Sequence, residues 1–303
     1  MYINFTNKVD IITFIYCFLL SLFMIFVSTA CLKGSDSRFT RNLSYVLDIY
    51  KRLGIKNIEL GSVHEKINDF TPLFRYKKEN NANFIIHGFF PPTDAKFMMN
   101  LASQNSRILK GTIAIAKNGI EMCNKLDSNL YSMHAGHCAD VFVNQSKCKK
   151  IISADKAIEI SANSLGILCD YAKKLDVKIA VENSNGFTEN TFNYSIESFN
   201  EIFRKVSSRN LGVLIDIGHL NMAAKHFGFD KKDFIKKLQS KVLELHCHEN
   251  HGMKDEHLNV KNKDLLNSFD KDVLKKIAVT LEANWLDENG IKEGKLILEK
   301  IIT

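Results

Sequence analysis

The sequence lacks the cysteine and glycine patterns that identify several common kinds of site. Its seven cysteines include no CxxC pair, which excludes a thiolate-rich structural zinc site. An odd number of unpaired cysteines is typical of reduced thiols, so we expect a cytoplasmic protein. No GxGxxG loop follows the first predicted strand, so the fingerprint of a dinucleotide-binding sheet is missing. No linker or low-complexity segment divides the chain, which favours a single domain.

The composition fits a globular chain with a large core but does not select a partner. The chain has 303 residues, of which 45% are hydrophobic, enough for one large α/β barrel or two smaller domains. Its 41 Lys and Arg against 34 Asp and Glu give a net charge of +7. That excess fits an anionic partner such as a sugar phosphate or a nucleic acid, but it is also common in proteins that bind neither.

The amino-terminal region allows two interpretations. Residues 11–30 are almost wholly apolar, which taken alone predicts a membrane anchor or a signal peptide. The flank carries only Lys8 and Asp10, which is poor for either. The interpretation that we favour begins at Met24, where MIFVSTACL reads as a short strand. Residues 1–23 are then a hydrophobic extension of a folded domain at 24–303, and contact with a membrane is the alternative.

Eight short apolar segments are predicted to be strands, and they alternate with helical segments at fairly even spacing. The strands are expected at 24–31, 57–60, 84–87, 130–134, 178–182, 211–219, 242–247 and 277–282. The helices are expected at 42–53, 105–126, 154–175, 196–206, 232–238, 263–269 and 293–302. This alternation predicts a parallel (β/α)8 TIM barrel with an outer ring of helices. A doubly wound open sheet is the alternative.

Polar side chains that can bind metal stand where the predicted strands end. Asp216 and His219, for example, follow the apolar run LGVLI, and such groups are costly to bury unless something pairs with them. Because active sites of these barrels lie at the carboxyl ends of the strands, we expect such residues to converge. Carboxylates mixed with imidazoles suit Zn²⁺ or Mn²⁺. The strand-end set is Glu59, His87, His134, Glu182, Asp216, His246 and Glu282, followed closely by His137, Asn183, His219, His248, Asp255 and His257.

Strand order divides these candidates into groups that could each hold one ion. The last four strands supply Glu182, Asp216, His246 and Glu282, which could share one ion because neighbouring strand ends are adjacent in space. A second ion could lie between His87 and His134, with Glu182 as a bridge. A third could be held by His219, Asp255 and His257. The sequence therefore predicts one to three divalent ions per chain.

Several segments resemble the xylose-isomerase-like barrel superfamily, which contains sugar isomerases, sugar epimerases and the endonuclease-IV type of apurinic/apyrimidinic (AP) endonuclease. They are IELG, IIHG, NLAS, SMHAGH, AVENSNG, LGVLIDIGHLNMAA, ELHCHEN, KDEH and TLEAN, and the resemblance runs from about residue 24 to the end. For the isomerases it implies a metal set of Glu182, Asp216, His246 and Glu282, with His219 binding substrate. For the endonuclease branch it implies nine ligands around three zinc ions, which are His87, His134, Glu182, Asp216, His219, His246, Asp255, His257 and Glu282.

The resemblance implies a metal-dependent isomerase or epimerase that acts on a sugar or sugar phosphate through an enediolate. Glu182 and Glu282 would move the proton, His219 would orient a hydroxyl, and the substrate-binding candidates are His248, Asn183 and Glu59. A zinc phosphodiesterase that cleaves abasic sites in DNA is the alternative. The loop FPPTDAKFM and the segment LNVK depart from the endonuclease pattern. A barrel kept only for binding is disfavoured, because a degenerate site would be expected to lose carboxylates.

Overall fold

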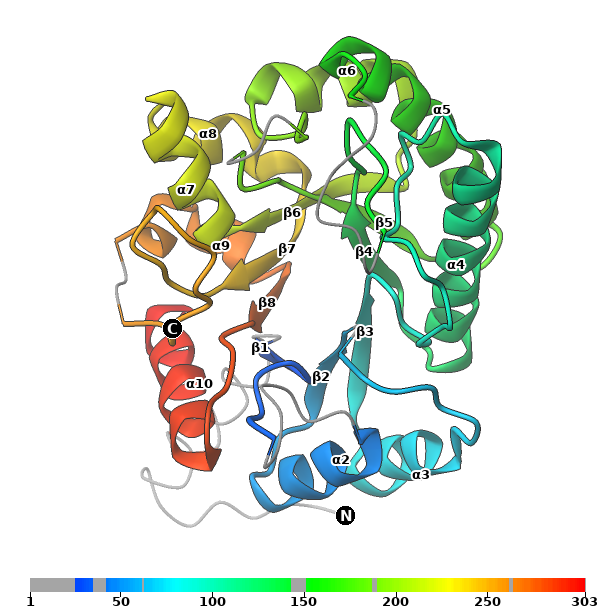
Figure 1. Ribbon diagram of the computed structural model, residues 1–303. Coiled ribbons are helices and arrows are strands. Elements are labelled where there is room, and N and C mark those ends of the chain that lie inside the picture. Colours follow the sequence, from blue (N-terminus) through cyan, green and yellow to red (C-terminus); the bar gives the residue numbers. More distant parts are fainter. Residues whose placement is uncertain are drawn as a thin grey trace, which may run out of the picture.

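Eight parallel strands form a closed barrel, and each strand pairs with the strands that precede and follow it in the chain (Figure 1). The computed structural model describes residues 25–34, 42–61, 63–142, 151–186, 190–261 and 264–302. Pairing of Ile25 with Val279 joins the first strand to the last and closes the sheet. The predicted barrel is therefore confirmed, and the open-sheet alternative is wrong. The strands are β1 (Ile25–Ser28), β2 (Asn57–Leu60), β3 (Asn83–His87), β4 (Leu130–His134), β5 (Lys178–Glu182), β6 (Leu211–Asp216), β7 (Val242–Cys247) and β8 (Ala278–Leu281).

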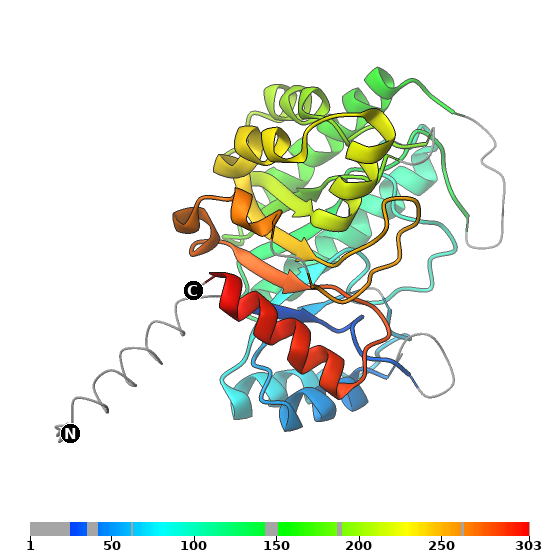
Figure 2. The ribbon, with the colours of Figure 1, turned by 90° about the vertical axis from the view of Figure 1, so that its left-hand side faces the viewer.

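Helices surround the strands on the outside of the barrel (Figures 1 and 2). Amphipathic spacing explains them, because each buries an apolar face against the sheet. They are α2 (Leu43–Arg52), α3 (Thr71–Asn80), α4 (Ser106–Lys125), α5 (Ala154–Lys173), α6 (Ile196–Val206), α7 (Ile217–Phe227), α8 (Lys231–Leu238), α9 (Lys271–Leu274) and α10 (Glu288–Ile302). Two 3₁₀ turns complete the described elements, η1 (Gln239–Lys241) and η2 (Leu266–Ser268).

Several of the predicted elements are wrong. The helices α7 and α9 were not expected, and the helix expected at 293–302 begins at Glu288. The strand expected at 211–219 ends at Asp216, and α7 begins at the next residue. The helix α3 was not expected, because its apolar spacing is weak. In place of the helix expected at 263–269, the described residues 264–269 contain only the 3₁₀ turn η2.

The apolar core has an outer layer and a smaller inner cluster. Val27 faces outward toward the helices, whereas its neighbour Phe26 faces the barrel interior, as strand alternation requires. Further along the strands the buried side chains become polar, with Glu59, Glu244 and His246 all 0% exposed. This change from apolar to polar along the barrel axis positions the site at the carboxyl ends of the strands. The inner apolar cluster is Phe26, Ile85, Leu130, Ala180, Leu214 and Ala278.

The first strand begins inside the apolar run that suggested a membrane anchor. Residues 25–28 of that run form β1, as the interpretation from Met24 expects. The extension at 1–23 lies outside the described residues. Every helix in the described ranges is too short or too polar to cross a bilayer.

Candidate metal centre

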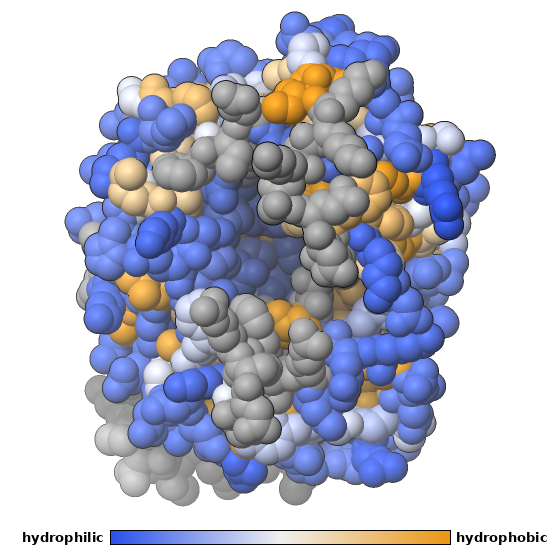
Figure 3. All heavy atoms as spheres, viewed as in Figure 1, coloured by the Kyte–Doolittle hydropathy of each residue, from blue (hydrophilic) through white to orange (hydrophobic). Residues whose placement is uncertain are grey.

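A cavity of about 380 Å³ opens at the carboxyl ends of the strands. Figure 3 shows a hollow in the middle of this face, lined largely by hydrophilic residues where it is described. Seven of the residues that line the cavity are ligand candidates from the sequence, namely His87, His134, Glu182, His219, Asp255, His257 and Glu282. Five of these seven come from the ends of, or the loops after, β5 to β8.

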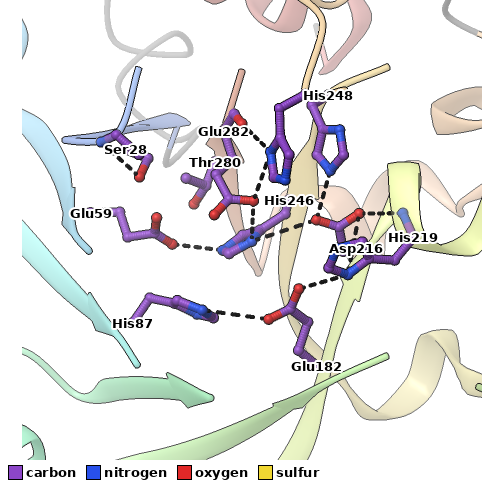
Figure 4. A network of polar contacts seen from close by, with 12 residues as sticks. Ser28, Glu59, His87, Glu182, Asp216, His219, His246, His248, Thr280 and Glu282 are labelled. Carbon is purple, nitrogen blue, oxygen red and sulfur yellow. Dashed lines mark hydrogen bonds and ion pairs between the residues drawn. The ribbon is translucent and has the colours of Figure 1, made fainter. Parts of the chain in front are cut away.

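The central group is built around His246 (Figure 4). Its Nδ1 lies 2.9 Å from Oε2 of Glu282 and 3.8 Å from Oδ2 of Asp216. One ligand atom each from Glu182, Asp216 and His246 lie within 4.8 Å of one another. Glu182 is 2% exposed, and Asp216 and His246 are 0% exposed. The structure therefore brings together the four residues that strand order assigned to one ion.

Two further groups adjoin the central one through Glu182. Oε2 of Glu182 lies 3.2 Å from Nδ1 of His134 and 3.5 Å from Nε2 of His87. Its Oε1 lies 2.9 Å from Nδ1 of His219. Glu182 thus stands between the pair His87 and His134 on one side and His219 on the other, as a bridging ligand would.

The third group surrounds Asp255, which comes from the loop after β7. Its Oδ2 lies 3.0 Å from Nε2 of His219, and its Oδ1 lies 3.3 Å from Nε2 of His257. His248 belongs to this group as well, because its ring stacks on His257 with centroids 3.8 Å apart. All nine ligand candidates therefore lie in five overlapping groups, each of three or four possible ligands.

Asp216 has a second role, which explains why α7 begins directly after β6. Its side chain accepts a hydrogen bond of 2.6 Å from the backbone N–H of His219 and so caps the helix. Because residues three apart lie on the same face of a helix, the side chain of His219 lies on the same side as that of Asp216, toward the site. The spacing of Asp216 and His219 thus sets both the cap and the site.

The charges of the site are balanced by histidines. Burial alone would lower the pKa of His219, but the surrounding carboxylates, Asp216 foremost, hold it well above its ordinary value. Burial alone would raise the pKa of Glu182, but His134 and then His219 hold it below its ordinary range. Burial is likewise outweighed at His257, where Asp255 and Glu282 raise the pKa to about 9.

The residues fit a bound divalent cation. Nδ1 of His246, Nδ1 of His248 and Oε2 of Glu182 are buried without a hydrogen-bond partner. The ion pairs of Glu182, Asp216, Asp255 and Glu282 that the described residues make are all with histidines, never with Lys or Arg. Buried carboxylates and imidazole lone pairs aimed at one another are unfavourable unless a proton or a cation lies between them. This donor set is the one that Zn²⁺ and Mn²⁺ accept.

We expect apparent metal affinity to rise with pH. His257 must lose its proton before it can bind an ion, so below its pKa of about 9 affinity should increase by up to about tenfold per pH unit for that proton. Competition with a chromophoric chelator at pH 6.5 and 7.5 measures this. The folding stability of the metal-free protein should instead fall as pH rises. The raised pKa of His257 contributes stability that is fully present below about pH 6.5 and is lost as the pH rises through about 9. A pH-independent affinity would contradict the expectation.

The three residues expected to bind substrate do not line the cavity, and each makes a polar contact inside the protein instead. The Asn183 side chain donates to the backbone oxygen of Asp216 at 3.1 Å and accepts from its N–H at 2.7 Å, so it ties β5 to β6. His248 contacts Oδ2 of Asp216 through Nε2 at 3.0 Å. Glu59 contacts His246 from inside the barrel. We therefore reinterpret them as residues that support the site.

The cavity is also lined by loop residues that were not singled out from the sequence as site residues. They lie at the end of β1 or in the loops after β1, β2, β3 and β5, and none of them has a charged or imidazole side chain. Asn100 was noted only within NLAS, yet its Oδ1 accepts from the backbone N–H groups of Ala102 and His137 and so shapes the loop after β4. The additional lining residues are Ser28, Ala30, Gly61, Val63, Met98, Ser184, Asn185, Asn190 and Thr191.

Gly218 is expected to be essential for the position of His248. A Cβ atom at Gly218 would lie 2.0 Å from Cε1 of His248, which is 1% exposed and cannot move freely. Gly218→Ala should therefore destabilise the protein by about 1–3 kcal/mol in urea unfolding. Gly166→Ala is the matched control, because its Cβ would meet nothing within 4 Å and helical alanine should stabilise by about 0.5–1 kcal/mol. Equal stability of the two variants would contradict the packing described.

Comparisons with known proteins agree with this fold. A family model described as xylose isomerase-like TIM barrel matches residues 38–300. The uncharacterized protein MJ1614 of Methanocaldococcus jannaschii is 28% identical over 254 residues, which is 83% of this chain and 87% of that protein. The uncharacterized protein MJ1311 of the same organism is 29% identical over 165 residues, 54% of this chain. The chain thus matches about half the length of the latter, 52%.

Solved structures of epimerases share the fold. A D-tagatose 3-epimerase-like protein has a TM-score of 0.69 at 21% identity, covering 92% of this chain and 96% of that one. A D-allulose 3-epimerase from Methylomonas sp. has a TM-score of 0.68 at 13% identity, covering 93% and 98%. A 3-keto-D-glucoside 4-epimerase from E. coli has a TM-score of 0.66 at 12% identity, covering 92% and 98%. At these identities the likeness concerns the fold alone.

Proposed function

The chain belongs to the xylose isomerase-like TIM barrel family, and from that premise we propose that it is a divalent-metal-dependent isomerase or epimerase of a sugar or sugar phosphate. The observation that carries the proposal is the pair Glu182 and Glu282. Both line the cavity, and they lie on different sides of His246 (Figure 4). The fold that the chain shares with sugar epimerases supports the same class of reaction.

The two carboxylates are suited to moving a proton. The pKa of Glu282 lies below its ordinary value, because His246 and His257 outweigh the effect of burial. The pKa of Glu182 is also lowered, as described above. Both are therefore ionised at neutral pH and can act as a base. One would take the proton from the carbon next to the substrate carbonyl. The same or the opposing carboxylate would return it, at the neighbouring carbon for an isomerase or on the other face for an epimerase.

The remaining residues would hold the ion and the substrate. Glu182, Asp216, His246 and Glu282 would hold a divalent ion, which would polarise the substrate oxygens and stabilise the charge of an enediolate. His219 lines the cavity between Glu182 and Asp255, where it would orient a substrate hydroxyl. In a cavity of about 380 Å³ a monosaccharide or its phosphate would fit.

Deuterium exchange tests this proposal directly. The Mn²⁺- or Zn²⁺-loaded protein is incubated in D₂O with a panel of ketopentoses, ketohexoses and their phosphates, and NMR follows the carbon next to the carbonyl. We expect deuterium at that carbon and a second sugar among the products. Absence of exchange across the panel, with metal bound, would overturn the proposal.

One observation favours a second candidate, a phosphodiesterase that acts on abasic DNA. All nine ligand candidates lie in overlapping groups of three or four possible ligands, as a site for more than one ion requires. Three ions would activate a water molecule and neutralise phosphate oxygens. Native mass spectrometry and an abasic oligonucleotide separate the candidates. About three zinc ions with strand cleavage would favour the phosphodiesterase, whereas about one ion with deuterium exchange would favour the isomerase or epimerase.

A further inference from the structure

We propose that Glu59 is a positioning residue that fixes the ring of His246 so that Nδ1 faces the candidate metal centre. This inference rests on the metal dependence of the proposed function, but not on which reaction the metal serves. Glu59 comes from β2 and His246 from β7, so only closure of the barrel brings them together.

The contact between the two side chains is short and fully buried. Oε2 of Glu59 lies 2.7 Å from Nε2 of His246, and both residues are 0% exposed. A carboxylate can only accept, so Nε2–H of the imidazole is the donor. With this proton on Nε2, Nδ1 is the ring nitrogen left to bind a cation.

The opposite edge of the ring faces the site. Nδ1 of His246 has no hydrogen-bond partner, and its nearest polar neighbours are the carboxylates of Glu282 at 2.9 Å and Asp216 at 3.8 Å. Figure 4 shows Glu59 and Asp216 on opposite sides of the ring. A lone pair among carboxylates is the arrangement of a ligand in a metal site, and a histidine ligand is commonly held by a carboxylate at its other nitrogen.

A second buried carboxylate nearby provides an internal comparison. Oε1 of Glu244 lies 3.5 Å from Nε2 of His246 and accepts a hydrogen bond of 3.0 Å from Oγ1 of Thr280. Glu244 is thus partnered by another residue, and its contact with the ring is longer than the 2.7 Å contact that Glu59 makes. Of the two carboxylates, the shorter contact assigns the positioning role to Glu59.

Burial of Glu59 is hard to explain by stability alone. Its Oε1 has no hydrogen-bond partner, and an unsatisfied buried carboxylate oxygen costs stability. Glu59 does not line the cavity, so direct substrate contact does not account for it. A role in holding the ring of His246 accounts for the burial of Glu59.

The wild-type protein allows the first test. Proton–nitrogen correlation spectra of ¹⁵N-histidine-labelled protein report which ring nitrogen carries the proton, and His246→Gln assigns the signal. With Zn²⁺ bound, we expect the proton of His246 on Nε2 and the metal on Nδ1. The opposite assignment would overturn the inference without any variant at Glu59.

Variants give the second test, with Mn²⁺ or Zn²⁺ affinity measured by chelator competition. Glu59→Leu should weaken binding by about 10–100-fold. Glu59→Gln, whose amide oxygen still accepts from Nε2–H, should stay within about threefold of wild type, as should the control Glu244→Gln. Unchanged affinity in Glu59→Leu, or an equal loss in Glu244→Gln, would overturn the inference. Should Glu59→Leu not fold, loss of affinity in Glu59→Gln would overturn it as well.

The outcomes separate this inference from the proposed function. Metal bound through Nδ1 of His246, with no deuterium exchange in any sugar, would reject the function and keep the inference. Deuterium exchange in a sugar, together with unchanged metal affinity in the Glu59 variants, would keep the function and reject the inference. A wild-type protein that binds neither Mn²⁺ nor Zn²⁺ would overturn both.

Discussion

Glu282→Gln is expected to lower turnover by about 10²–10⁴-fold, the contribution typical of a positioned general acid or base. Glu282 lines the cavity, and its side chain is 15% exposed, so it can reach a substrate carbon. Glutamine has nearly the same shape but cannot accept a proton. Deuterium exchange and product formation under saturating metal and sugar measure the effect, and calorimetry should show that the sugar still binds.

The control for this variant must separate proton transfer from metal binding. Glutamine keeps one oxygen that can ligate, and metal content is measured in parallel to verify occupancy. Glu288→Gln is a matched replacement at an exposed position of α10, where the carboxylate pairs with Arg52 on the surface. It should turn over at the wild-type rate. Retained turnover in a metal-loaded Glu282→Gln protein would remove Glu282 from the proposed mechanism.

Removal of the metal is expected to abolish activity and to lower thermal stability. At an ion concentration about 100 times the dissociation constant, binding to the folded state alone stabilises it by about 2.7 kcal/mol. For a domain of this size that corresponds to roughly 4–5 °C in Tm. The physical reason is that buried carboxylates and imidazoles lose the cation that neutralises them. Calorimetry before and after chelation, with Mn²⁺ or Zn²⁺ added back, gives the measurement.

Asp216→Asn is the control for the chelation experiment. Asparagine caps a helix about as well as aspartate, so α7 should remain intact. The variant loses a charged ligand, and its Tm should no longer respond to the chelator. An identical response in wild type and variant, or a wild-type protein that chelation leaves unchanged, would exclude Asp216 from the metal site.

The strands could be predicted because their signal is local. Each is a short apolar run that ends in a polar residue, and the predicted bounds of β4, β5 and β7 coincide with those observed. The helices α3 and α7 were missed, because each depends on a local feature that the apolar pattern does not record. For α7 that feature is the cap by Asp216, which stops the strand where the pattern still allowed it to continue.

The sequence by itself determined which residues are candidate ligands. Parallel strands in chain order must bring their carboxyl ends to one face, so Glu182, Asp216, His246 and Glu282 could be grouped from order alone. Only the tertiary structure decided which polar atoms reach the cavity and which are used inside the protein. Glu59 and Asn183 stand at strand ends like the ligands, yet one faces the barrel interior and the other ties two strands together. The direction of a side chain depends on barrel curvature and on contacts made across 187 residues of chain, and no local pattern carries that information.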